Sequence, residues 1–270
     1  MQNTMSNIHP TAIVEEGAEL GVDVQVGPFA VIYPQTQVGD RCTVGSHSVI
    51  LPRVTLGEEC RLHAHVVIGD LPQDLSFVDG ESTLIIGDRC VMREFFTAHR
   101  GTKEESETRI GSDCYFMNCS HVGHNCRVGD RVILANSSLL AGYVDVEDGA
   151  FLSGNTSVHQ FTRLGRLSMM GGQSAVSQDV PPFCTAEPTA LNTILGLNVV
   201  GMRRSGMGPE ERKQVKSAFR LLYHSGLTPS QAAAKIRVEF DSGPALEMAD
   251  FVDASKRGIC TTSRQSGTNH

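Results

Sequence analysis

One of the ten histidines in the chain stands in a pattern that could do chemistry. His124 is followed at intervals of 18 residues by Gly142 and Gln160. His121 stands shortly before His124, and His159 directly before Gln160. A neutral imidazole can take a proton from a hydroxyl at neutral pH, because its ordinary pKa is about 6.5. A glycine N–H can stabilise the oxyanion that forms when that hydroxyl attacks a thioester. Such a pair could serve acyl transfer, with His124 as general base and Gly142 as oxyanion donor, whereas an outward histidine taken singly is more often an ordinary surface residue.

A metal site is the competing interpretation of the same histidines. His121 and His124 are close enough in sequence to share an ion, but neither a carboxylate nor a third histidine stands at ligand spacing beside them. We therefore expect no metal and no other cofactor.

The interval of 18 matters because the chain repeats every six residues. Aliphatic residues recur at each sixth position in three phased runs, from Ile8 to Ile68, from Ile86 to Ala98 and from Ile110 to Val176. Six residues make one short strand and a turn, and three such units close a triangular coil that pairs with its neighbours about 4.8 Å away. The sequence predicts an all-β solenoid in which residues 18 apart form one column on one face.

A second inward position follows each aliphatic residue after four places, and small side chains occupy it. Free cysteine behaves as a small buried hydrophobe in such a place, and no CxxC spacing indicates a metal. The sequence favours a structural role over disulfides or metal ligands for the cysteines at this position, namely Cys42, Cys60, Cys90, Cys114 and Cys126.

Two interruptions break the solenoid, which is expected over residues 1–185. They fall at 69–85 and 101–109, and insertions in a repeat array project as loops, often on the working face. Pro181-Pro182 is expected to stop the coils.

Beyond the solenoid, residues 186–262 are predicted to form a linker and a C-terminal α-helical domain, with helical patterning from Pro209 onward. Val215, Phe219 and Leu222 fall on one stripe of the first helix. Thr228 with Gln231 is typical of a capping box that opens the second helix. Residues 263–270 are expected to be a disordered tail.

Charge is divided unevenly along a chain whose net charge is −7. Residues 201–270 hold 11 Lys and Arg against 7 Asp and Glu, which could steer an acidic partner, although solvated helix faces are the simpler explanation on charge alone. The N-terminus lacks the basic and apolar regions of a signal peptide, and no stretch approaches the roughly 18 apolar residues of a membrane span. We expect a cytoplasmic protein with no stable membrane insertion and no nucleic-acid partner.

Several segments together resemble the UDP-N-acetylglucosamine acyltransferases of lipid A biosynthesis, over nearly the whole chain. Their order and combination are specific, while any one hexapeptide is not. The segments are HPTAIVEEGA at 9–18, PQDL at 72–75, HRGT at 99–102, SHVGHNC at 120–126, ILANSSLLAG at 133–142, VHQF at 158–161, QDVPP at 178–182 and GLNVVGMRR at 196–204.

The resemblance implies a left-handed parallel β-helix, an exception to the usual right-handed crossover. It implies a homotrimer with active sites between neighbouring helices. In the family, a histidine matching His124 deprotonates the sugar 3-hydroxyl, which attacks a 3-hydroxyacyl chain carried on acyl carrier protein, and a glycine matching Gly142 supplies the oxyanion N–H. This is the first step of lipid A biosynthesis, and the basic C-terminal helices would dock the acidic carrier.

The resemblance also implies substrate-binding positions. Some contact the sugar and acyl chain, others the diphosphate or the nucleotide, and the glycine that limits the acyl groove leaves room for a longer hydroxyacyl chain. The positions are Gln73, Asp74, Ser76, His99, His121, His159, Gln160, Gly172, Asn198, Arg203 and Arg204.

The chain departs from the family pattern around the sugar and phosphates. Ser76 stands in place of a lysine, Ser205 of a second arginine, Tyr143 of a histidine, and Asn125 of the acidic residue after the base. These changes leave three interpretations in order: acylation of UDP-N-acetylglucosamine, acylation of a 3-amino UDP-sugar to an amide, and a non-catalytic or metal-binding trimer.

Overall fold

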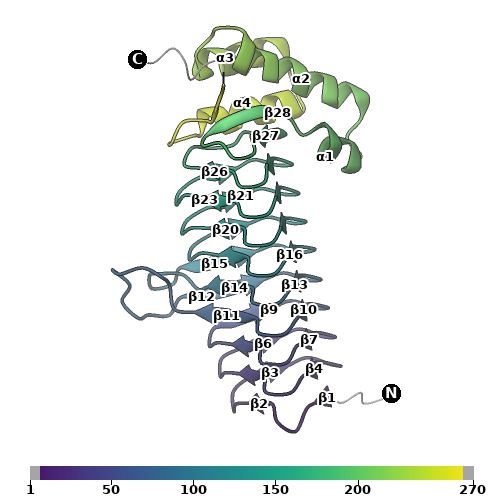
Figure 1. Ribbon diagram of the computed structural model, residues 1–270, viewed down its shortest axis with the longest axis vertical. Coiled ribbons are helices and arrows are strands. Elements are labelled where there is room, and N and C mark those ends of the chain that lie inside the picture. The colour runs from purple at the N-terminus through teal and green to yellow at the C-terminus, as the bar shows by residue number, and fades with distance from the viewer. Residues whose placement is uncertain (1–6, 264–270) are drawn as a thin grey trace.

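The computed structural model describes residues 7–263, and in it the short strands stack into a three-sided column (Figure 1). The helices gather at the C-terminal end of the column. The fold is a left-handed parallel β-helix of hexapeptide repeats with a C-terminal helical region, which confirms the predicted fold class. Of the expected tail, all but residue 263 lies outside the described residues.

Each side of the column is one sheet of parallel strands, named here A, B or C, and only the β27–β28 pair at the end of sheet A is antiparallel among residues 7–263. Sheet A contains β1 (Asn7–Ile8), β4 (Gln25–Val26), β7 (Thr43–Val44), β10 (Arg61–Leu62), β13 (Val91–Met92), β16 (Tyr115–Phe116), β19 (Ile133–Leu134), β22 (Phe151–Leu152), β25 (Met169–Met170), β27 (Cys184–Ala186), β28 (Thr193–Leu197) and β29 (Thr261–Thr262). Sheet B contains β2 (Ile13–Val14), β5 (Val31–Ile32), β8 (Val49–Ile50), β11 (Val67–Asp70), β14 (Thr97–His99), β17 (His121–Val122), β20 (Leu139–Leu140), β23 (Ser157–Val158) and β26 (Ala175–Val176). Sheet C contains β3 (Glu19–Leu20), β6 (Gln37–Val38), β9 (Val54–Leu56), β12 (Thr83–Ile86), β15 (Glu107–Ile110), β18 (Arg127–Val128), β21 (Asp145–Val146) and β24 (Arg163–Leu164).

The register of the sheets follows the period of the sequence. His121 pairs with Leu139, 18 residues further on, as the predicted coil requires. The two insertions lengthen single coils: Arg61 pairs with Val91, and Val91 with Tyr115. Figure 1 shows the insertions projecting together from one side of the column, beside β11, β12, β14 and β15. The strands above and below stay in phase, so the columns continue across both insertions and return to the 18-residue spacing beyond them.

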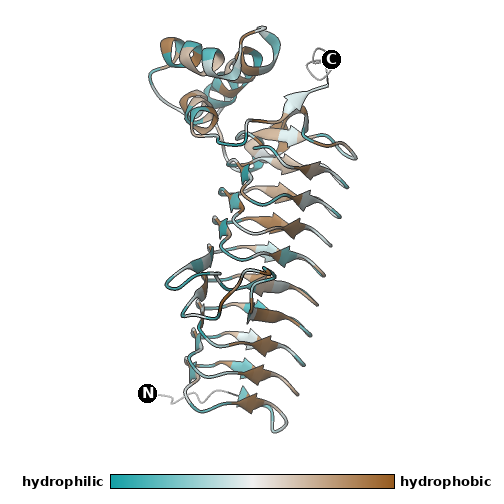
Figure 2. Ribbon diagram, turned by 90° about the vertical axis from the view of Figure 1, so that its left-hand side faces the viewer, coloured by the Kyte–Doolittle hydropathy of each residue, from teal (hydrophilic) through white to brown (hydrophobic). Residues whose placement is uncertain are grey.

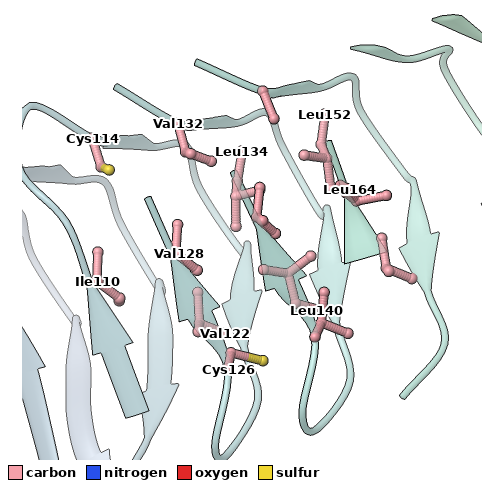
Figure 3. Close-up of a cluster of buried hydrophobic side chains, with 14 of the residues drawn as sticks. Ile110, Cys114, Val122, Cys126, Val128, Val132, Leu134, Leu140, Leu152 and Leu164 are labelled. Carbon is pink, nitrogen blue, oxygen red and sulfur yellow. The ribbon is translucent and has the colours of Figure 1, made fainter. Parts of the chain in front are cut away.

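The core is a stack of small aliphatic layers (Figure 3), and the strands form hydrophobic bands along the column (Figure 2). Val122 and Leu140 are fully buried on successive coils, and Cys126 fills the small position beside them. All five cysteines predicted at that position are buried and free. Each buried valine or leucine contributes roughly 2 kcal/mol, so the repeated layers carry the stability that a globular core would otherwise supply.

The turns between strands repeat a left-handed backbone conformation at bulky residues. Phe29, His47, His65 and Phe95 all have φ near +60°, where non-glycine residues are uncommon. Their rings stack on one another from coil to coil, with centroids 4.9–5.0 Å apart. The stacking of identical turns therefore offsets part of the backbone strain.

The end of the column differs from the coils below it. Beyond Pro181-Pro182, β27 still pairs in parallel with β25, and β28 then turns back antiparallel to β27. Up to residue 263, four helices follow: α1 (Val199–Arg204), α2 (Pro209–His224), α3 (Pro229–Glu239) and α4 (Pro244–Asp253). The short elements β27, β28 and α1 carry too little periodicity to be predicted.

The longer helices match the pattern read from the sequence. Val215, Phe219 and Leu222 are buried along α2, and Thr228 and Gln231 form the predicted capping box at the start of α3. Arg166 of the coils makes a two-pronged ion pair with Glu247 of α4, at 2.8 and 2.7 Å, which fastens the helices to the column. Among residues 7–263, none of the helices has the length and apolar character needed to cross a membrane.

Candidate active site

His124, Gly142 and Gln160 form the predicted column at the corner between sheets B and C. Each is the first turn residue after its strand, on three successive coils. A Cβ on Gly142 would overlap the His124 ring, with Cε1 and Nε2 as the closest atoms. The imidazole therefore packs against the glycine, and a side chain at residue 142 would displace it from this position. Gln160, the third member, is exposed.

His124 is more enclosed than the sequence suggested. It points away from the coil, yet only 8% of it is exposed. The Tyr143 ring stands edge-on to it, with centroids 5.3 Å apart at 86°, and the second insertion brings Thr102 to the same corner. The expected surface histidine is thus largely shielded from water, and hydrogen bonds in such an environment are stronger than in water.

The backbone N–H of Gly142 is available to a ligand. It donates to no other group within the described part of the chain, although the neighbouring N–H of Tyr143 bonds to the His124 carbonyl at 2.9 Å. A free N–H within reach of an imidazole is the arrangement that stabilises an oxyanion formed next to a general base.

Asn125 connects His124 to the second insertion. Its Oδ1 lies 3.1 Å from His124 Nδ1 and accepts from the N–H and the hydroxyl of Thr102, at 3.1 and 2.8 Å. The Thr102 hydroxyl also lies 2.8 Å from the hydroxyl of Tyr143. Two of the four departures noted in the sequence, Asn125 and Tyr143, therefore belong to one hydrogen-bonded network.

His99 and His121 lie on the sheet B side of this corner, on β14 and β17. Their rings meet edge to face at 4.8 Å, and the Thr97 hydroxyl lies 2.8 Å from His121 Nδ1. Burial lowers the pKa of both: that of His121 falls to about 4, with smaller contributions from His99 and His124, while that of His99 falls below its ordinary value. Both rings are therefore neutral at neutral pH and can act as hydrogen-bonding groups without adding charge.

The first insertion brings a carboxylate to the same corner. The Ser76 hydroxyl and N–H both donate to Asp74 Oδ1, at 2.7 and 2.9 Å. These bonds hold the pKa of Asp74 below its usual range, and the nearby His124 lowers it further. Ser76, which replaces the family lysine, thus orients Asp74. Gln73 is exposed beside it.

Arg100 anchors the first insertion, a role that the sequence did not reveal. Its side chain is buried and forms an ion pair with Asp79, and it also donates to the Gly80 carbonyl at 2.6 Å and to Ser82 at 3.0 Å. Arg53 donates to the same carbonyl at 2.9 Å. The position of Arg100 inside the HRGT segment was the available signal, because a buried arginine needs several partners.

Two other predicted positions lie outside the buried part of the corner. His159 is exposed, and its Nδ1 donates to the Gln160 carbonyl at 3.0 Å. Gly172 is at a different corner, between sheets A and B, where a Cβ would meet only the Gly154 carbonyl at 3.9 Å. A Cβ at Gly172 would therefore fit without a close contact.

The predicted nucleotide residues lie at a third place, around a cavity of about 1210 Å³ between sheet A and α1. Asn198, Arg204 and Ser205 line it, while the exposed Arg203 does not. Asn198 also caps α1: its Oδ1 accepts from Gly201 N and its Nδ2 donates to the Leu167 carbonyl, both at 2.9 Å. An asparagine just before a helix is the usual signal for such a cap.

One chain does not bring the base and the nucleotide residues together. His124 stands at the corner of sheets B and C, whereas the cavity lies over sheet A and the corner of sheets C and A. Within residues 7–263, no group of three or more His, Cys, Asp or Glu side chains is arranged to hold a metal ion.

The fold is that of the hexapeptide-repeat transferases, and the family model described as bacterial transferase hexapeptide (six repeats) matches residues 17–52, 36–70 and 107–142. The profile described as UDP N-acetylglucosamine O-acyltransferase, domain 2, matches residues 179–260. The second match covers the linker and the helices, which the repeat alone could not assign.

Relatives and solved structures cover the whole fold. Proteins named acyl-[acyl-carrier-protein]–UDP-N-acetylglucosamine O-acyltransferase are 52% identical over 257 residues in Alkalilimnicola ehrlichii and 45% identical over 261 residues in Burkholderia orbicola, each match covering 94% of this chain and 99% of the relative. The UDP-N-acetylglucosamine acyltransferase structure from Francisella novicida superposes with a TM-score of 0.90 at 32% identity, covering 97% of this chain and 99% of that one. The structure from Campylobacter jejuni gives 0.89 at 35%, covering 94% and 99%. The chain belongs to the UDP-N-acetylglucosamine O-acyltransferase family, which confirms the resemblance.

Proposed function

We propose that this chain transfers a 3-hydroxyacyl group from acyl carrier protein to the 3-hydroxyl of UDP-N-acetylglucosamine, the first step of lipid A biosynthesis. The observation that carries the proposal is the enclosed His124 imidazole lying against Gly142, whose N–H has no partner in the described chain. The names of the relatives supply the donor and acceptor classes.

The reaction divides between these two residues. His124 takes the proton of the sugar 3-hydroxyl as its oxygen attacks the thioester carbonyl carbon of the acyl carrier. The carbonyl oxygen becomes an oxyanion that accepts a hydrogen bond from Gly142 N–H. The carbon–sulfur bond then breaks, and the imidazolium returns its proton to the departing thiolate. The products are the 3-O-acyl sugar nucleotide and the free carrier thiol.

The two separate places suggest how the substrate is held. We propose a homotrimer in which the corner of one copy faces the cavity of the next, since the base and Arg204 lie on different sides of a single column. Asp74, His121 and Gln160 would contact the sugar and acyl chain, and His99 and His159 would lie near the acyl chain or diphosphate. Lys213, Lys216 and Arg220 project from one side of α2 and would attract the acidic carrier.

A second acceptor is favoured by one specific observation. Ser76 points its hydroxyl at Asp74 and Ser205 lines the cavity, so two positions that are basic in the family are neutral here. A 3-amino UDP-sugar, giving an amide, is therefore the second candidate. Gly172 leaves space for a longer hydroxyacyl chain under either acceptor.

To test this, purified protein is assayed in parallel with each acceptor and with acyl carrier proteins loaded with different hydroxyacyl chains. The products are identified by mass spectrometry. We expect faster acylation of UDP-N-acetylglucosamine, and equal rates would defeat that order. His124→Ala should lower turnover at least about a hundredfold. His65→Ala, which removes an exposed histidine in the lower coils, is the matched control. A His124→Ala protein with normal turnover would overturn the mechanism.

A further inference from the structure

We propose that Asn125, held by Thr102 of the second insertion, keeps the hydrogen of neutral His124 on Nδ1, which leaves Nε2 as the basic nitrogen without help from a carboxylate. The inference rests on the proposed function, in which His124 is the general base. It makes Asn125 and Thr102 positioning residues and gives the second insertion a part in the reaction.

The direction of the hydrogen bonds around Asn125 follows from the backbone N–H of Thr102, which can donate but cannot accept. The N–H of Thr102 points at the Asn125 amide from 3.1 Å, so the amide atom there must be the oxygen. The same oxygen lies 3.1 Å from His124 Nδ1. An amide oxygen only accepts, so Nδ1 must carry a hydrogen, and a neutral imidazole then keeps its lone pair on Nε2.

Thr102 of the second insertion holds the Asn125 side chain, and Thr108 of β15, where the insertion rejoins sheet C, holds its backbone. The Thr102 hydroxyl donates to Asn125 Oδ1 at 2.8 Å, and the Asn125 N–H donates to the Thr108 hydroxyl at 2.7 Å. With the Thr102 hydrogen used in this way, the Tyr143 hydroxyl is the donor in its 2.8 Å contact with Thr102. Thr102 and His124 are each only 8% exposed, so water has little access to replace these partners.

The Nε2 edge of His124 is the edge that the chain leaves for a substrate. Cε1 and Nε2 are the ring atoms nearest to the place of a Cβ on Gly142, and the N–H of that glycine bonds to nothing in residues 7–263. Fixing the hydrogen on Nδ1 therefore leaves the basic nitrogen on the ring edge that faces Gly142, the residue that carries the proposed oxyanion donor. The other tautomer would turn its lone pair toward an oxygen and its hydrogen toward the acceptor hydroxyl.

Asn125 fixes the tautomer without adding charge. A carboxylate in its place would also accept from Nδ1–H, but its negative charge would favour the protonated imidazole. A base supported by an amide stays neutral to lower pH than one supported by a carboxylate. This predicts that the two kinds of support differ in the acid limb of the pH–rate profile.

Four variants test the proposal by kinetics. Asn125 has φ +59°, so Asn125→Gly removes the side chain without straining the backbone. We expect it to lower kcat about thirtyfold with KM changed less than about threefold, since geometry rather than binding is lost. Asn125→Asp should retain turnover at high pH while its acid limb moves up by about one pH unit. Thr102→Val should lower kcat about threefold, and Thr102→Ser should restore it.

A measurement on the resting protein separates this inference from the proposed function. In protein labelled with ¹⁵N in its histidine rings, the His124 signals are those missing from His124→Gln, and their chemical shifts report which nitrogen carries hydrogen. A hydrogen on Nδ1 supports the proposal. A hydrogen on Nε2, wild-type kcat in Asn125→Gly, or an acid limb that stays in place in Asn125→Asp would overturn it. If the wild-type protein acylated neither acceptor, the proposed function would fail while the ring signals still decided the tautomer.

Discussion

The corner that carries His124 and the cavity beside α1 are assembled in different ways. At the corner, His124, Gly142 and Gln160 come from successive coils, so the 18-residue register alone places them in a column. At the cavity, Asn198 caps and Arg204 ends a helix that reaches the coils only after β28 has turned back on β27. The first place depends on local repetition and the second on packing between distant segments.

This difference shows which features of the protein tolerate change. A solenoid contacts itself only between neighbouring coils, so a substitution at the corner acts on one or two coils. The helices are fastened by a few specific contacts, such as the ion pair between Arg166 and Glu247. Single substitutions at the corner should therefore have large effects on activity, and single substitutions at the cavity smaller ones.

The largest effect is expected from Gly142→Ala. The new Cβ would overlap the His124 ring and displace the base, so kcat/KM should fall at least about a hundredfold with little change in melting temperature. Gly154→Ala is the matched control, because it changes the same turn position on another corner, where a Cβ meets only the Asn136 carbonyl at 3.4 Å. Steady-state kinetics of both variants measure this. Normal activity in Gly142→Ala would show that the register does not decide the corner.

A smaller effect is expected at the cavity from Arg204→Ala. Loss of one charge-assisted contact to a phosphate costs roughly 1–3 kcal/mol of binding free energy, and about 1.4 kcal/mol corresponds to a tenfold loss of affinity. The KM for the UDP-sugar should therefore rise about tenfold with kcat nearly unchanged. Arg203→Ala, which alters the neighbouring exposed arginine outside the cavity, should change KM less than about twofold. Equal effects in the two variants would remove the cavity from the proposed site.

Arg100→Met tests how far the corner depends on its insertions. The buried guanidinium holds Asp79 and the Gly80 carbonyl, so its loss should loosen the segment that carries Asp74 and lower kcat/KM about fivefold. Limited proteolysis of residues 71–80 should speed up in the same variant. Arg53→Met, which removes a single bond to Gly80, should have a weaker effect. Unchanged kinetics with faster proteolysis would show that the insertion does not position the site.

The smallest effect concerns stability against pH. The pKa of His121 is about 4 in the folded protein and about 6.5 in an unfolded chain, so between these values the unfolded chain binds more protons. Stability should therefore fall as pH falls, by about 1 kcal/mol between pH 7 and pH 5.5. Urea unfolding of the wild type and His121→Gln at both pH values measures this, with the exposed His65→Gln as control. The same pH dependence in all three proteins would contradict the assignment.

Sequence reading was most successful where contacts are local. The hexapeptide period predicted the strands, the inward cysteines and the column of His124 and Gly142, and the 3.6-residue period predicted the buried stripe of α2. It was least successful where two segments meet. The bond between Thr102 and Asn125 spans 23 residues and the second insertion, and nothing in either segment alone indicates it.

By itself, the sequence determined the coil, its register and therefore which residues share a corner, because a repeat of fixed length places every side chain relative to the coils above and below. Only the tertiary structure decided how enclosed His124 is, which groups bond to its Nδ1 and where α1 meets the column. Those properties depend on insertions and on the C-terminal helices, whose positions are set by contacts between residues far apart in the chain. A periodic sequence pattern does not indicate such long-range contacts.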